Sequence, residues 1–217
     1  MKTPNLITTS IAATAVLTAV TTHADPVEDL VARIKSPDDK IRGPAWQGAA
    51  SAGAAAIKPL AVVMSDSDFE VARSAKRAVW LIVRHAGRPG AGDERKAVQA
   101  ALLVVGCQKG QPAPVRKEAL WMLSEIGDAE VVEPMALLLA DAELREDARC
   151  ALMRLPGPQV TEAFDRAFRA APEEFKSALA ESLRQRGQTV SGYPSAKLVP
   201  VKQTSLSPAP PATKTGS

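Results

Sequence analysis

The stretch "VRKEALWMLSEIG" (residues 115–127) has the pattern of an amphipathic helix that ends at a glycine. Its apolar residues Val115, Ala119, Leu123 and Ile126 share one helical face at about 100° per residue. Gly127 follows them, and glycine commonly occupies the position just after a helix. An apolar stripe of this kind needs a neighbouring element against which it can be buried, so the question is whether the chain repeats it.

The same frame recurs along the chain. Its apolar anchors are Ile41, Val71, Val115, Leu144 and Phe175, separated by 30, 44, 29 and 31 residues. Alanine or leucine follows at helical spacing in each copy, and a glycine closes three of them, at Gly53, Gly127 and Gly187. Internal periodicity of 20–50 residues predicts stacked supersecondary units. The one long gap contains a Gly/Pro-rich insertion, "HAGRPGAGDERK" (85–96).

Each unit has a second half that contains a proline. The segments Ile57-Lys58-Pro59-Leu60 and Val132-Glu133-Pro134-Met135 match one another, and Val27 to Leu30 aligns with the first of them. Proline is tolerated in a first helical turn, where its missing N–H is not needed. We therefore predict the order helix, Gly-containing turn, Pro-started helix, acidic turn, with Asp66 and Asp141 closing the Pro-started helices.

The repeat resembles the HEAT-like repeats of the phycobilisome-lyase type. The best single copy is residues 115–141, and the resemblance covers roughly residues 27–187. It implies an all-α fold, a right-handed α–α superhelix (a HEAT-like solenoid) of about four to five helix pairs. First helices would line one face and Pro-started helices the other, with caps at 26–35 and 172–187. Ala72 and Pro156-Gly157 depart from the pattern. Tetratricopeptide repeats fit less well, because their ~34-residue period is absent.

The two ends of the chain differ from the repeat region. Residues 1–24 have the layout of a signal peptide, with Lys2, an apolar stretch from Leu6 to Val20, and small residues before a predicted cleavage after Ala24. An uncleaved anchor helix is the alternative. We predict periplasmic or secreted localisation and no transmembrane segment after signal removal. Residues 25–187 then form the repeat domain, and residues 188–217 a disordered tail rich in Pro, Ser, Thr and Lys.

The predicted repeat domain is nearly neutral. It carries 23 of the 27 basic residues, all except Lys2, Lys197, Lys202 and Lys214, together with all 24 acidic residues, so its net charge is −1. A neutral domain lacks the field that holds a phosphate backbone. This composition argues against a nucleic-acid partner.

Few residues are available for catalysis or metal binding. After Ala24 the chain contains one histidine, His85, and two cysteines, Cys107 and Cys150. A zinc site usually needs several His and Cys ligands at close spacing. Cys107 would lie at a helix C-terminus, where the dipole raises the pKa of the thiol. The sequence therefore predicts no enzyme, no metal and no cofactor, and two packed thiols are favoured over a disulfide.

Two groups of residues are candidates for binding a partner. Trp46, Trp80 and Trp121 lie at comparable points of the predicted first helices, so they either pack between neighbouring helices or form an aromatic strip that receives a partner. The insertion and the residue just before it contain four basic residues. These residues either belong to an exposed loop followed by an Asp93 N-cap or make a specific contact. These basic residues are Arg84, Arg88, Arg95 and Lys96.

A basic residue recurs in the first turn of the first helices, as Arg42, Arg116, Arg145 and Lys176. A cation there opposes the helix dipole. We therefore predict acidic partners in the turns, at Asp38 and Asp39, Asp66 and Asp68, or Asp141 and Glu143, forming a ladder of charge-assisted hydrogen bonds between repeats.

Taken together, these patterns predict a non-catalytic HEAT-repeat scaffold or adaptor that binds a protein or peptide partner outside the cytoplasm. The alternative is an accessory protein or carrier that handles a small ligand or cofactor for an envelope enzyme. That carrier would have a deep pocket lined by Met64, Met135 and neighbouring apolar residues. The oligomeric state is left open.

Overall fold

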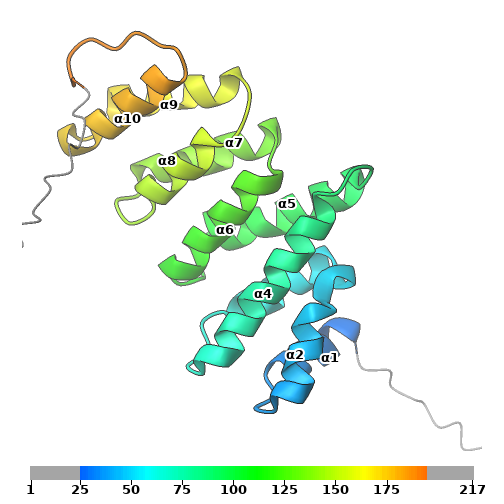
Figure 1. Ribbon diagram of the computed structural model, residues 1–217. Helices are drawn as coiled ribbons and strands as arrows, with labels where there is room; N and C mark the ends of the chain where they lie inside the picture. Colours follow the sequence, from blue (N-terminus) through cyan, green and yellow to red (C-terminus); the bar gives the residue numbers. More distant parts are fainter. Residues whose placement is uncertain (1–24, 195–217) are drawn as a thin grey trace, which may run out of the picture. The chain divides into compact units, whose positions relative to one another are not determined.

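The computed structural model describes residues 25–194, and the predicted signal segment and residues 195–217 lie outside that range. Between residues 25 and 194 the fold is all-α, without a β-strand (Figure 1). None of these helices has the length and apolarity needed to cross a membrane. The α-helices are α1 (Pro26–Ile34), α2 (Asp39–Gln47), α3 (Ile57–Val63), α4 (Phe69–Ala86), α5 (Gly92–Cys107), α6 (Ala113–Ile126), α7 (Ala129–Ala136), α8 (Arg145–Met153), α9 (Pro158–Ala170) and α10 (Glu173–Gln185), and the 3₁₀ helices are η1 (Ala49–Ala52), η2 (Ala54–Ala56) and η3 (Leu137–Ala140).

The chain divides into two compact units, the first ending at His85 and the second beginning at Ala86. In the first unit, α1 packs against both α2 and α3. The guanidinium of Arg77 on α4 lies over the ring of Trp46 on α2, 5.1 Å from its centroid. The first unit therefore has α1 and α3 in contact on one side and α2 and α4 in contact on the other.

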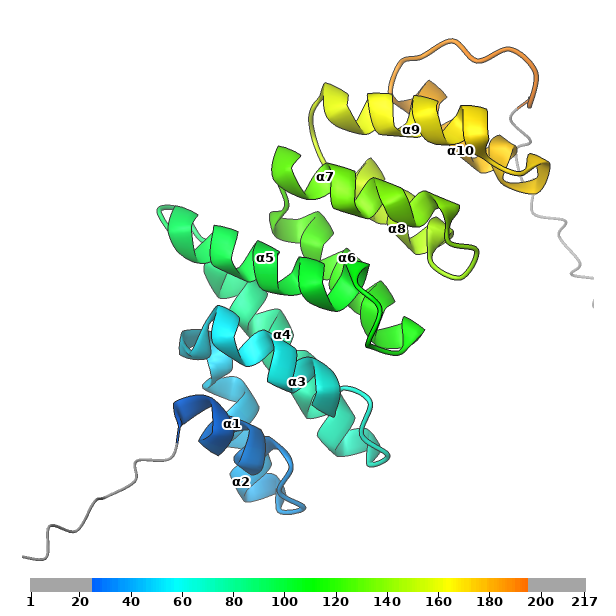
Figure 2. The same cartoon turned by 180° about the vertical axis from the view of Figure 1, so that it is seen from behind.

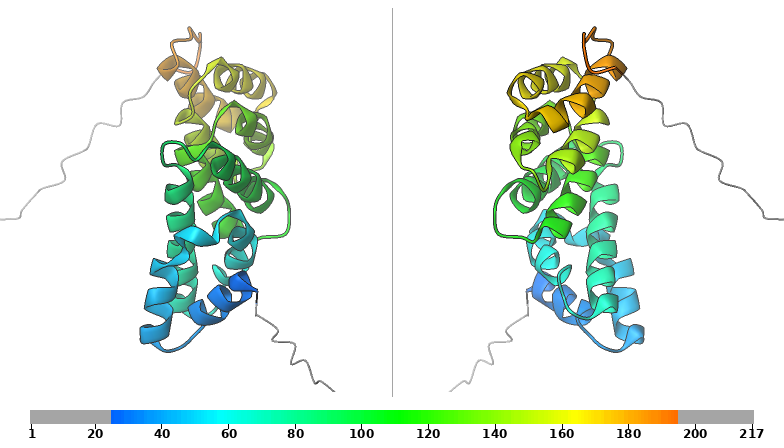
Figure 3. Two further views of the ribbon diagram at one scale, coloured as in Figure 1. Left: turned by 90° about the vertical axis from the view of Figure 1, so that its right-hand side faces the viewer. Right: turned by 90° about the vertical axis from the view of Figure 1, so that its left-hand side faces the viewer.

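The second unit consists of three antiparallel helix pairs in two layers. α5 pairs with α6, α7 with α8, and α9 with α10. Contacts also run from α5 to α7 to α9 and from α6 to α8 to α10. Figure 2 shows α5, α7 and α9 side by side, and the two layers are seen edge-on in Figure 3. The helical-repeat fold predicted from the periodicity is confirmed. In the second unit we call α6, α8 and α10 the first-helix layer and α5, α7 and α9 the second-helix layer; in the first unit α2 and α4 are the first helices and α1 and α3 the second helices.

The predicted apolar positions form the core, with one exception. Val115, Ala119, Leu123 and Ile126 are all buried, as are their counterparts in the frames that begin at Val71 and Leu144. Ile41 is the exception, with 44% of its surface exposed. It lies on α2, in the first helix pair of the described chain, so no earlier pair covers it.

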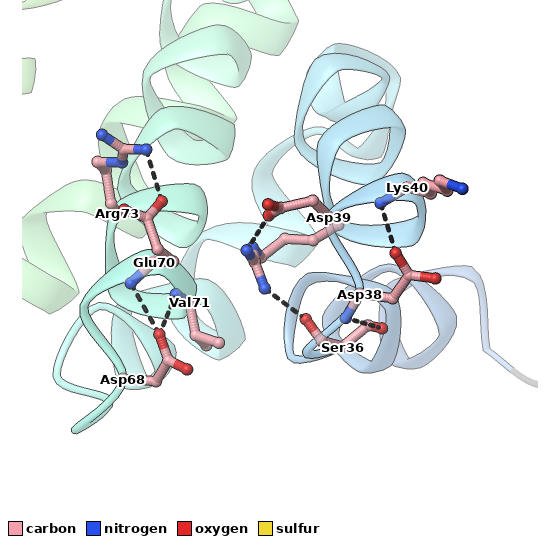
Figure 4. Close-up of polar contacts among 9 residues, drawn as sticks. Ser36, Asp38, Asp39, Lys40, Asp68, Glu70, Val71 and Arg73 are labelled. Carbon is pink, nitrogen blue, oxygen red and sulfur yellow. Dashed lines mark hydrogen bonds and ion pairs between the residues drawn. The ribbon is translucent and has the colours of Figure 1, made fainter.

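Aspartates in the turns cap the helices that follow them. The Asp38 carboxylate accepts a hydrogen bond from the backbone N–H of Lys40, and the Asp68 carboxylate accepts from Glu70 and Val71 (Figure 4). Such caps satisfy backbone donors that have no partner inside the helix. Asp141 accepts from the N–H of Glu143 within the turn, whereas α8 begins only at Arg145, with Leu144 as its N-cap residue and no side-chain cap.

Two sequence-based predictions about helix starts were wrong. α5 begins at Gly92 with Ala91 as its N-cap residue, so Asp93 lies inside the first turn. Pro134 lies within α7 and not in its first turn, whereas Pro59 does occupy the first turn of α3. Proline cannot donate to the preceding carbonyl in a helix interior. Three residues after Pro134, α7 changes to the tighter helix η3, whose first residue, Leu137, is 72% exposed.

The predicted charge ladder is present only in part. Arg116 on α6 forms an ion pair with Asp141, a predicted acid, at 3.8 Å, whereas Arg145 on α8 pairs with Glu174 on α10, which was not predicted, at 3.5 Å. The first pair lies within the copy 115–141, and the second joins neighbouring repeats. Arg42 pairs with Asp39 of its own helix and donates to the Ser36 carbonyl at 2.7 Å. In the last pair, Lys176 likewise contacts an acid of its own helix, at 3.1 Å.

Candidate partner-binding surfaces

In the first unit, every tryptophan has an arginine over its ring. Trp46 is half-buried beneath Arg77 of α4, and Trp80 is half-buried beneath Arg84 of its own helix, 5.4 Å from the ring centroid. The arginine is attracted to the negative face of the ring and partly covers it. Each pair therefore presents an aromatic surface and a cation at the same place.

The second unit has a similar arrangement. Trp121 on α6 is 36% exposed, and Arg154, which follows α8, lies 5.8 Å from its ring centroid. The guanidinium of Arg154 also pairs with Glu125 at 2.5 Å, which holds it in position. Arg145 on α8 lies 4.8 Å from the ring of Phe175 on α10. These aromatic–arginine pairs join successive helices of the first-helix layer within the unit.

Both interpretations of the tryptophans describe part of this arrangement. Trp46 and Trp121 do pack against residues of the neighbouring first helix or its end, and yet their rings are only partly covered. A partly exposed tryptophan beside arginine has the composition of a binding hot spot. Whether a partner binds there stays a prediction.

The basic residues of the insertion do not gather into one patch. Arg88 forms an ion pair with Glu94 at 2.8 Å, and Lys96 pairs with Glu130 of α7 at 3.1 Å. The carboxylate of Glu130 raises the pKa of Lys96 by accepting a hydrogen bond from it. Arg95 is exposed on the first turn of α5, and Arg84 stacks on Trp80 as described above. Most of this charge is therefore committed to contacts within each unit.

The cysteines have the properties of packed thiols. Both Cys107 and Cys150 are free and half-buried. Burial raises the pKa of Cys107 to about 11, although nearby Arg116 acts in the opposite direction. A thiol with a raised pKa is a poor nucleophile at neutral pH. Within residues 25–194, no group of three or more His, Cys, Asp or Glu side chains is arranged to hold a metal ion.

A groove in the second-helix layer of the second unit was not predicted. It has a volume of ≈ 340 Å³ and lies between α7–η3 and α9. The exposed Leu137, Pro172 and the Glu133–Arg166 ion pair, with 2.5 Å between N and O, contribute to its lining. The rest is mostly small side chains, namely Ala136, Ala140, Ala163, Ala167, Ala170 and Ala171. The predicted carrier pocket is not this groove, since Met135 is fully buried in the core and Met64 belongs to the first unit.

Comparisons with known proteins give structural matches only. No protein-family model matches the chain, and no curated protein matches it. Among solved structures, it is similar to a designed armadillo repeat protein in complex with the peptide (KR)4, with 20% identity and a TM-score of 0.34, covering 75% of this chain and 88% of that one. A second designed armadillo repeat protein has 17% identity and a TM-score of 0.27, with 73% and 98% covered.

Proposed function

We propose that this protein is a non-catalytic helical-repeat scaffold that binds a protein or peptide partner through the first helices of its units. The observation that carries this proposal is the set of aromatic–arginine pairs around Trp46, Trp80 and Trp121. Tryptophan and arginine are the residues most enriched at energetically important points of interfaces. The partner would contact the exposed part of each ring and the guanidinium beside it.

The geometry of these pairs limits the cost of binding. Immobilising a flexible arginine on binding costs roughly 0.5–1.5 kcal/mol. Arg154 is already held between Trp121 and Glu125, so much of this cost falls on folding and not on association. A partner with a carboxylate and an apolar side chain close together matches such a pair, since the free edge of the guanidinium donates charge-assisted hydrogen bonds to a carboxylate and the ring offers apolar area.

The cellular location and the finer family assignment belong to this proposal. The signal-like layout of residues 1–24 supports action in the periplasm or outside the cell. The similarity of residues 115–141 to phycobilisome-lyase-type HEAT repeats supports assignment to that class of repeat. The raised pKa of Cys107 supports a binding role in preference to thiol catalysis.

A peptide-display selection tests the proposal. Peptides selected on the intact protein should change its tryptophan fluorescence, because all three tryptophans lie on first helices, namely α2, α4 and α6. The double variant Trp46→Ala/Trp121→Ala should bind them at least about 30-fold more weakly, as expected for the loss of a hot spot. Val104→Ser, on α5 in the second-helix layer of the second unit and 38% exposed, is the matched control and should bind normally. Unchanged binding by the double variant would rule out this surface.

A further inference from the structure

The groove between α7–η3 and α9 is independent of the surface proposed above, because it lies on the other layer of the second unit. Most of its lining is small and apolar, with Leu137 exposed at its edge, and the Glu133–Arg166 ion pair completes the lining. On α9 and just after it, the lining runs from Ala163 to Ala171, which corresponds to about 12 Å along a helix axis. A site of this length and character suits a short extended apolar peptide.

The described chain ends beside one end of this groove. After α10, residues 188–194 return toward α9, where the ring of Tyr193 packs edge-on against Phe168 with 5.4 Å between centroids. The Tyr193 hydroxyl donates to Glu173 at 2.6 Å, and Arg184 donates to the Tyr193 carbonyl. Glu173 directly follows Pro172, which lines the groove. These contacts fix the point from which the following residues continue.

The sequence that follows matches the groove in length. Residues 197–202 read "KLVPVK", an apolar tetrapeptide between two lysines. Three residues separate Pro194 from Leu198, and an extended chain covers about 13 Å over these four steps. The tetrapeptide Leu198–Val201 spans a similar length. Its proline favours an extended backbone and removes one N–H that an apolar groove could not satisfy.

The charges at the two ends of the groove also match. Glu173 and Glu174 are exposed next to Pro172, at the end where the chain arrives, and would face Lys197. Glu133 is exposed at the opposite end and would face Lys202. We propose that the chain's own residues Leu198–Val201 bind in the groove between α7–η3 and α9, with Lys197 and Lys202 next to these acidic residues.

This assignment makes the groove a peptide site with a tethered ligand. A tethered segment acts at an effective concentration in the millimolar range. A free peptide of the same sequence, or a partner with a similar apolar segment, must compete with it.

The experiment uses the full chain and a fluorescein-labelled peptide of residues 195–203, with binding followed by fluorescence anisotropy. In the full chain carrying Leu198→Asp and Val201→Asp, the tethered segment no longer competes, and the peptide should bind. The unaltered chain should bind it about 10-fold more weakly or worse. Adding Ala170→Trp to the double variant fills the groove and should abolish binding. Ala100→Trp, an exposed alanine on α5 outside the groove lining, is the matched control.

Three results would overturn the proposal. The first is no peptide binding by the double variant, although circular dichroism shows it folded. The second is equal binding in the presence of Ala170→Trp. The third is a full chain that is dimeric by light scattering and becomes monomeric with Leu198→Asp and Val201→Asp, which would assign the groove to the segment of a second copy. A failure of the tryptophan surface in the selection described above would affect none of these outcomes.

Discussion

Arg116 shows how a single buried cation joins successive elements. Only 8% of the residue is exposed; its Nε donates to the Gly106 carbonyl at 3.1 Å, and Nη1 faces Asp141. Methionine has a similar volume but cannot donate, so Arg116→Met leaves a buried carbonyl without its partner. We expect a loss of about 1.5–3 kcal/mol in the free energy of unfolding, measured by urea denaturation. Arg95→Met, at an exposed position, should change it by no more than about 0.5 kcal/mol. Equal effects would mean that Arg116 is merely solvated.

Cys107 should react slowly with alkylating reagents. Its pKa is raised to about 11 from a usual value of 9.0, mainly by burial. At pH 8 the thiolate fraction is then about 100-fold lower than in the unfolded chain. In a Cys150→Ser background, iodoacetamide should therefore label the native protein about 100-fold more slowly than the urea-unfolded protein. Comparable rates at pH 8 would contradict the buried thiol.

The same shift has a consequence for stability. Because the folded state holds the Cys107 proton more tightly than the unfolded state does, its contribution to stability is complete below about pH 9. That contribution is lost as the pH rises toward 11. The difference in unfolding free energy between the wild type and Cys107→Ala should thus stay constant up to about pH 9 and then change in favour of the alanine variant.

At the scale of helices and turns, the repeated glycine serves different purposes in different repeats. Gly53 and Gly187 have positive φ angles of 62° and 83°, which other residues rarely adopt. Gly127 has an ordinary φ of −68°, and what excludes a side chain there is space. A Cβ at Gly127 would lie 2.5 Å from the Leu123 carbonyl oxygen and 2.7 Å from Val131. The three glycines therefore hold the same position in the repeat for different reasons. Gly53 and Gly187 are needed for their positive φ angles, and Gly127 is needed because there is no space for a side chain.

Gly127→Ala should accordingly destabilise the second unit. The added methyl group forces the turn between α6 and α7 to move, and overpacking of this kind costs about 1–3 kcal/mol. Gly92→Ala is the matched control, because Gly92 is the exposed first residue of α5 and, apart from its chain neighbours and its own helix backbone, nothing stands within 4 Å of the new methyl group. That substitution should leave stability unchanged or raise it by up to about 1 kcal/mol. In melting curves recorded by circular dichroism, Gly127→Ala should therefore have a clearly lower melting temperature than wild type. The control variant should have an equal or higher one.

The elements could be predicted from the sequence where local rules decide them. Val71, Ala75, Val79 and Ile82 are spaced as a buried helix face, and they are buried. The prediction that Pro134 begins a helix was wrong, because this proline lies in the interior of α7. The resulting change from α7 to η3 coincides with the exposed Leu137 and one wall of the groove. Such a wall depends on how two helices approach one another, which hydrophobic spacing alone does not specify.

At the scale of the whole molecule, only part of the candidate site could be predicted from the sequence. The tryptophans could be singled out, but the arginines over two of them come from about one repeat later, Arg77 after Trp46 and Arg154 after Trp121. Pairing residues at an offset of 31 to 33 would have found them, as it would have found Glu133 with Arg166. Composition and motif searches look for residues that are neighbours in sequence. In a helical repeat, neighbours in space are separated by the period.

The export proposal makes a definite prediction about the mature chain. Cleavage after Ala24 would leave Asp25 as the first residue, and the Asp25 side chain caps α1 by accepting from the N–H of Val27 at 2.8 Å. A cut one residue later would remove this cap and cost α1 about 1 kcal/mol. Mass spectrometry of protein secreted by a bacterial host should therefore find an N-terminal Asp25. Ala24→Lys should block processing, because the peptidase needs a small residue there, whereas Thr22→Ala keeps a small residue and should be processed normally. Recovery of the intact chain from the cytosol, with Met1 or Lys2 at its N-terminus, would refute the predicted signal.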